Sequence, residues 1–182
     1  MYFPYLRGKQ YELLAIKEIS SLLGPAHQVT PVIEPVRDPK GSGLDRCIAA
    51  LVGDGLEFIL IVNPAVGALR GRGISAAIHS HVNLIDSGES WGLGLLVDES
   101  TEMGVLLEDY EVAFGRSRPL TLIHRGYAAD LNEAAALTAP FNRRYDLIDH
   151  SLRRARYRAL LSTSSGVVLR DAFPGSSYLS VG

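Results

Sequence analysis

Short runs of aliphatic and β-branched residues recur along the chain, with their first residues 21 to 34 positions apart. The runs are Tyr2–Leu6, Val29–Ile33, Phe58–Val62, Gly92–Val97, Leu120–Ile123, Tyr145–Ile148 and Gly166–Leu169. Each interval is close to the length of one strand plus one crossover helix, and several runs are apolar on both faces, as in strands covered on both sides. The spacing therefore predicts an α/β fold with seven mostly parallel strands.

Helical patterns fill the intervals between the runs. Residues 10–23 carry apolar side chains at helical spacing, and Gly24-Pro25 is a strong helix stop. Further helices are expected over residues 44–52, 75–87, 102–114, 131–137 and 152–161. Pro31 interrupts one run and has no N–H for a sheet, so we expect a bulge or a strand start there.

Two closures of such a sheet compete. A doubly wound open sheet that binds dinucleotides has a glycine-rich turn after its first strand, and Arg7-Gly8-Lys9-Gln10 is not one. A complete (β/α) barrel normally takes about 250 residues. The present chain has 182 residues, and an eighth strand is missing unless residues 177–181 form a stub. We therefore favour one barrel-like domain over residues 1–182, incompletely closed.

Composition narrows the class of protein but not its chemistry. The net charge of −2 offers no global attraction for nucleic acid or an anionic membrane. The start of the chain does not read as a signal peptide, and no apolar run approaches the roughly 20 residues that span a bilayer. Cys47 is the one cysteine, which excludes an intramolecular disulfide and suits a reducing compartment. We expect a cytoplasmic protein with Cys47 in its core.

Polar or charged residues follow nearly every strand run. The carboxyl ends of parallel strands share one rim, and α/β folds place their sites there. The candidate catalytic residues at this rim are Lys9, Glu34, Asp98, His124, Asp149 and Asp171. The candidate substrate-binding residues are Asn63, Arg125 and Arg170.

These residue types suit acid–base chemistry or phosphate handling. His124 and Glu34 are the general acid and base candidates. The carboxylates are also suitable ligands for a divalent metal such as Mg²⁺ or Ca²⁺, and the cationic side chains would clamp an anionic group. The alternative interpretation is an ion-pair network that only closes the top of the barrel.

The opening segment Tyr2-Phe3-Pro4-Tyr5-Leu6-Arg7-Gly8-Lys9-Gln10-Tyr11-Glu12 resembles the start of the beta-protein family, which is named after a phage protein and found in many bacteria. Further segments are similar in the same order: Val32-Ile33-Glu34-Pro35-Val36, Ile61-Val62-Asn63-Pro64, Ile123-His124-Arg125-Gly126 and Val168-Leu169-Arg170-Asp171-Ala172-Phe173. The resemblance covers most of the chain. It implies a barrel-like α/β fold, a short or truncated member, and no settled activity.

Two functions remain open at this point. The first is a hydrolase or lyase that acts on a small anionic or phosphorylated substrate at the rim. The second, suggested only by the family resemblance, is a non-catalytic interaction protein that works with a nuclease-like partner in a phage-related or defence gene pair. The first and last strand runs would leave open sheet edges, which predict a homodimer or a companion polypeptide that covers them.

Overall fold

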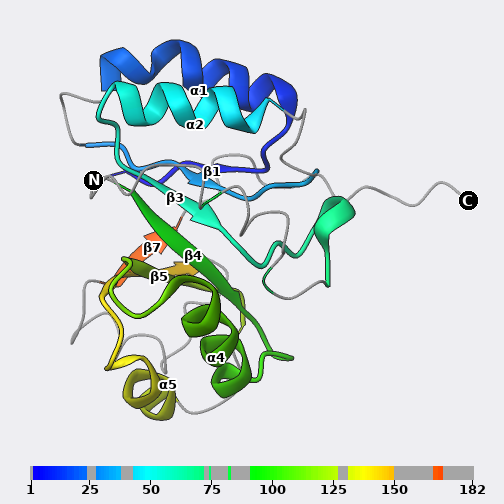
Figure 1. The fold of residues 1–182 in the computed structure, drawn as a ribbon, viewed down its shortest axis with the longest axis vertical. Coiled ribbons are helices and arrows are strands. Elements are labelled where there is room, and N and C mark those ends of the chain that lie inside the picture. Colours follow the sequence, from blue (N-terminus) through cyan, green and yellow to red (C-terminus); the bar gives the residue numbers. More distant parts are fainter. Residues whose placement is uncertain are drawn as a thin grey trace, which may run out of the picture.

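The computed structural model describes residues 2–23, 28–37, 43–71, 74, 82, 91–126, 131–149 and 166–169. Its sheet has the strand order β1-β2-β3-β4-β5-β6-β7, and every neighbouring pair is parallel. The strands are β1 (Tyr5–Leu6), β2 (Val32–Ile33), β3 (Phe58–Ile61), β4 (Trp91–Val97), β5 (Leu120–His124), β6 (Arg143–Asp149) and β7 (Gly166–Leu169). The strands β1 to β6 form a curled half-barrel, and β7 pairs with β6 beyond them (Figure 1). The prediction of a mostly parallel, barrel-like α/β fold is confirmed.

The described helices are α1 (Gln10–Leu23), α2 (Leu44–Gly53), α4 (Met103–Phe114) and α5 (Leu131–Thr138), together with the short 3-10 helix η2 (Gly67–Leu69). The four α-helices match the expected ones to within one residue at either end. All four α-helices pack on the outer face of the curled sheet. The helices α1 and α2 lie together at one end of the curl, and α4 and α5 lie together at the other end (Figure 1). The helices expected over 75–87 and 152–161 and the stub at 177–181 lie outside the described residues, apart from residue 82. No helix in the described ranges is long and apolar enough to cross a membrane.

The strands β1 and β2 are short, but their pairing extends beyond them. An isolated parallel bridge joins Tyr2 to Val29, and the N–H of Val32 donates to the carbonyl of Pro4 at 2.9 Å. The regular strand β2 begins at Val32, directly after Pro31, because proline has no N–H to donate to the ladder. The strand start expected at this proline is confirmed.

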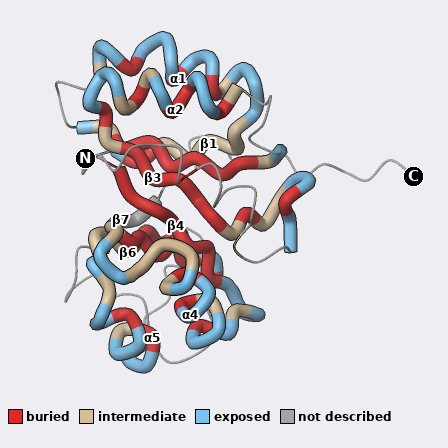
Figure 2. Tube along the Cα trace, in the orientation of Figure 1, coloured by how far each residue is buried: buried red, intermediate tan, exposed pale blue. Residues whose placement is uncertain are grey.

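Side chains alternate between the two faces of the sheet and build a core in two layers. The outer layer lies between the strands and the helices and includes Phe58, Leu95 and Leu122. The inner layer fills the concave face and consists of Phe3, Val32, Ile59, Ile61, Leu96, Ile123 and Leu147, with Tyr5, Ala65 and Tyr145 packed against it. Figure 2 shows that the strands β2 to β5 are buried, whereas the helices are exposed on their outer faces. The curl of the sheet is therefore held by apolar contacts on both of its faces.

Candidate functional site

The rim residues take one of two faces according to their place in the two-residue strand period. Glu34, Asn63, Asp98 and Arg125 each follow an inner-layer residue by two positions. The backbone therefore directs them to the concave side, at the carboxyl ends of β2, β3, β4 and β5. His124 instead follows Leu122, which belongs to the outer layer. One rim thus carries two separate groups of candidate residues.

Glu34 is fully buried at the end of β2, and two groups hold its carboxylate. The Tyr5 hydroxyl donates to one carboxylate oxygen at 2.6 Å, and the N–H of Ala65 donates to the other at 2.8 Å. Burial, followed by the nearby Glu34 charge, raises the pKa of Tyr5 far above its ordinary value, so the phenol stays protonated and donates. The Glu34 carboxylate therefore ties β1 and the segment after β3 to β2.

Asn63 lies where β3 ends and forms two hydrogen bonds to the backbone of β4. Its side-chain N–H donates to the Leu96 carbonyl at 2.9 Å, and its side-chain oxygen accepts from the Leu96 N–H at 2.8 Å. The amide thus takes the place of one more residue of strand ladder between β3 and β4. Both polar ends of the Asn63 side chain therefore bond to the sheet backbone.

Asp98 and Arg125 lie in the exposed part of the rim. One Asp98 oxygen accepts hydrogen bonds from the Ser100 backbone and from the hydroxyls of Ser100 and Thr101, which form the turn before α4. The Ser100 hydroxyl is the main reason that the pKa of Asp98 is lowered, and the Arg125 charge contributes last. The Arg125 guanidinium lies 5.9 Å from the centre of the Tyr5 ring. Arg125 is therefore an exposed cation of the concave rim.

His124 belongs to a buried polar cluster on the helix side of the sheet. Its Nε2 atom lies 3.1 Å from Asp146 Oδ1, and both side chains are almost fully buried. The Arg143 Nε–H donates to the other Asp146 oxygen at 2.9 Å, and Arg143 also donates to the Thr138 hydroxyl at the end of α5 at 3.1 Å. Burial by itself would raise the pKa of Asp146, but hydrogen bonds from His124 and Arg143 and the Arg143 charge outweigh it and lower the pKa.

The structure thus separates the two residues expected to act as acid and base. Glu34 and His124 lie at the same end of the sheet but on opposite faces. The sequence interpretation missed Asp146 and Arg143, although Asp146 lies within a strand run where a lone carboxylate needs a partner. The Asp149 side chain, and all of Arg170 and Asp171, lie outside the described residues.

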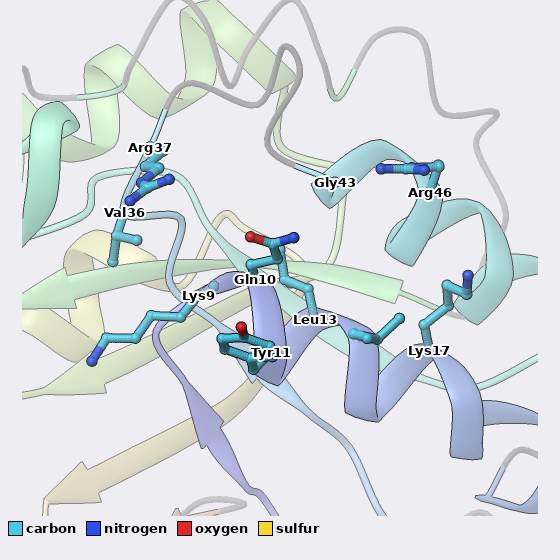
Figure 3. A pocket seen from close by; sticks show the side chains of 11 residues that line it. Lys9, Gln10, Tyr11, Leu13, Lys17, Val36, Arg37, Gly43 and Arg46 are labelled. Carbon is cyan, nitrogen blue, oxygen red and sulfur yellow. The ribbon is translucent and has the colours of Figure 1, made fainter.

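A groove of about 540 Å³ opens beside the concave rim, at the carboxyl ends of β1 and β2. Its lining includes four cationic side chains from α1, α2 and the segments before them: Lys9, Lys17, Arg37 and Arg46. Within the described ranges none of these four forms an ion pair. Lys9 and Arg37 lie towards one end of the groove, and Lys17 and Arg46 towards the other (Figure 3).

The local backbone explains how this groove forms. Gly8 turns the chain from β1 into α1 with φ of +58°, and a Cβ at Gly8 would lie 2.9 Å from the carbonyl oxygen of Glu34. Only glycine allows α1 to begin so close to the end of β2. Of the four cations, only Lys9 was predicted. The available signal for the other three was that each lies on or just before one of the first two helices.

The described residues hold no group of three or more histidine, cysteine, aspartate or glutamate side chains that could bind a metal ion. Cys47 is fully buried against α1, and burial raises the pKa of its thiol to about 11, so it behaves as a core residue. Comparison of the chain with protein-family models, with curated proteins and with solved structures found no match.

Proposed function

We propose that the protein binds a small anionic ligand, with phosphate as its recognised group, in the groove at the carboxyl ends of β1 and β2. The observation that carries this proposal is that Lys9, Lys17, Arg37 and Arg46 all line one groove of about 540 Å³. This volume lies within the range of small-molecule sites. Four like charges around one concavity repel each other, and an anion relieves that repulsion.

The N-termini of two helices also favour an anionic ligand in this groove. The groove includes Gln10, the first residue of α1, and Gly43, which precedes the first residue of α2. The N-terminal amides of a helix carry a partial positive charge and favour anions. The two helix N-termini and the four cationic side chains therefore all favour binding of an anion.

The geometry favours a protein that binds this ligand without acid–base catalysis by Glu34 and His124. Glu34 and His124 lie on opposite faces of the sheet, so they do not reach the same atom of one substrate. Each is also engaged with a protein partner, Glu34 with Tyr5 and His124 with Asp146. A hydrolase or lyase would need its acid and base elsewhere on the rim.

A thermal-shift titration with inorganic phosphate and pyrophosphate tests the proposal. Both anions should raise the melting temperature of the wild type beyond the effect of sodium chloride at equal ionic strength, because a ligand that binds only the folded state stabilises it. Arg46→Ala should abolish most of this shift. Arg116→Ala is the control: it also removes an exposed arginine, but one that lies outside the groove and pairs with Glu111, so this variant should retain the shift. Equal shifts in both variants, or no shift in the wild type, would overturn the proposal.

A second proposal concerns the edges of the sheet. The strands β1 and β7 are the two ends of the strand order, so we propose an incompletely closed, seven-stranded barrel whose open side a second copy or a companion chain covers. The exposed side chain of Tyr2, which lies just before β1 and bridges to Val29, adds apolar surface at this edge. Light scattering during gel filtration tests it, and a monomer at high concentration would contradict the second copy.

A further inference from the structure

We infer that the ligand of the cationic groove is a single strand of nucleic acid, held by its phosphates and by a base stacked on Tyr11. This inference rests on the proposed function and extends it, because the recognised phosphate is here part of a longer chain and not of a small ligand. It uses the spacing of the cations and the exposure of Tyr11 between them.

The cations at the two ends of the groove are too far apart to share one phosphate group. Lys9 directly precedes α1 and Lys17 lies eight positions further along it, which corresponds to about 12 Å at 1.5 Å per residue. Figure 3 shows them at opposite ends of the groove, with Arg37 on the side of Lys9 and Arg46 on the side of Lys17. A ligand that uses both ends must carry at least two separate anionic groups along a chain.

Between the two ends lies an aromatic side chain with little role in the fold. Tyr11 lines the groove and is 83% exposed. A phenol ring so exposed contributes little to folding, whereas proteins that bind single strands use exposed aromatic rings as platforms for bases. The side-chain amide of Gln10, next to Tyr11 in Figure 3, can both donate to and accept from a base edge.

These features distinguish nucleic acid from other polyanions. An acidic peptide or an inorganic polyphosphate would use the four cations but would leave the Tyr11 ring without a stacking partner. A duplex would present its phosphates but keeps the faces of its bases stacked inside. A single strand offers both repeated phosphates and free base faces.

The net charge of −2 bears on where the affinity comes from and on how it depends on salt. The whole molecule does not attract a polyanion, so affinity has to come from the groove itself and has to fall with salt. For single strands the slope of log K against log salt is about −0.7 per neutralised phosphate. Four cations therefore set a limit of about −2.8, and loss of one cation should reduce the slope by about 0.7.

Fluorescence anisotropy with a labelled decamer of deoxythymidylate tests the inference. We expect the decamer to bind the wild type at least tenfold more tightly than thymidine monophosphate or pyrophosphate measured by competition. Tyr11→Ala should weaken decamer binding by about 5-fold to 150-fold, the range seen for loss of one stacked base. Tyr11→Phe keeps the ring and should bind as the wild type does. Leu22→Ala, another exposed apolar residue on α1, is the matched control and should change nothing.

The outcomes separate this inference from the proposed function. If pyrophosphate binds in an Arg46-dependent way but the decamer binds no tighter, the anion site stands and the single-strand inference fails. If poly-glutamate or a DNA duplex of similar charge binds as tightly as the decamer, or if Tyr11→Ala binds normally, the inference also fails. If none of the anions binds, both proposals are wrong.

Discussion

The side-chain amide of Asn63 forms a pair of hydrogen bonds with the backbone of Leu96, donating at 2.9 Å and accepting at 2.8 Å. This pair extends the contact between β3 and β4 after the regular pairing has ended at Ile61 and Gly94. It also shows why a polar residue directly after a strand need not face a ligand. At this rim, some of the polar side chains form hydrogen bonds with the backbone of the sheet itself.

Replacement of Asn63 by alanine should destabilise the fold. The change removes both bonds and leaves the buried Leu96 N–H and carbonyl without their partner, so we expect a loss of about 2 kcal/mol in the free energy of unfolding. Urea denaturation measures it. Asn142→Ala is the control, because its exposed amide makes one bond to the Ser117 carbonyl, and its loss should stay below about 1 kcal/mol. Equal losses in the two variants would contradict the role assigned to Asn63.

Replacement of Tyr5 by phenylalanine should remove the hydroxyl that supports the buried Glu34 carboxylate. Hydrogen bonds to charged groups contribute about 1.5–3 kcal/mol, and we expect a loss of that size at pH 7. The double variant Tyr5→Phe, Glu34→Gln should lose less than the sum of the two single variants, because the two groups are direct partners. Additive losses in this double-mutant cycle would show that the bond contributes nothing.

The same pair predicts a dependence on alkaline pH. The folded-state pKa of Tyr5 lies above its unfolded value near 10, so its contribution to stability is complete below pH 10 and is lost as the pH rises further. The difference in unfolding free energy between the wild type and Tyr5→Phe should therefore shrink above about pH 10. Denaturant titrations at pH 7, 9, 10 and 11 measure it, and a constant difference would count against the raised pKa.

Asp146 should contribute to stability at neutral pH and lose that contribution in acid. Its folded-state pKa is lowered, so its contribution is present above the unfolded value near 3.9 and is lost as the pH falls through the folded value. Asp146→Asn should be less stable than the wild type at pH 7, and this gap should narrow below about pH 4. The exposed Asp109→Asn on α4 is the control and should show little gap at either pH. A gap that stays constant with pH would contradict the charged cluster around Asp146.

Gly94 should not tolerate a methyl group. A Cβ at Gly94 would lie 2.9 Å from Ile123 Cδ1 and 3.0 Å from Ile59 Cγ2, within the inner core layer. Overpacking of this kind costs about 1–3 kcal/mol, so Gly94→Ala should lower the free energy of unfolding by that amount. Gly104→Ala in α4 meets nothing within 4 Å and should instead stabilise by about 0.5–1 kcal/mol. A neutral Gly94→Ala would mean that the concave face is loosely packed.

Local patterns in the sequence were enough to predict most of the architecture. The bounds of α1 were predicted to the residue, because its apolar spacing and the following Gly24-Pro25 are both local signals. The parallel order of the sheet followed from the alternation of strand runs and helices, since a parallel connection requires a crossover. Those polar residues at the carboxyl ends of the strands that the structure describes do lie at one rim, because parallel strands all end on the same side.

Only the tertiary structure decided what those residues do. Ile123, His124 and Arg125 are neighbours in sequence, yet the strand period of two directs His124 to the helices and Arg125 to the concave rim. That difference separates His124 from Glu34 and gives it Asp146 as a partner instead. The sequence alone does not state which face of each strand becomes concave, because both faces are apolar and the curl arises from packing of the whole sheet. The cationic groove has the same origin: Lys17 and Arg46 are distant in sequence and line one surface only because α1 packs beside α2.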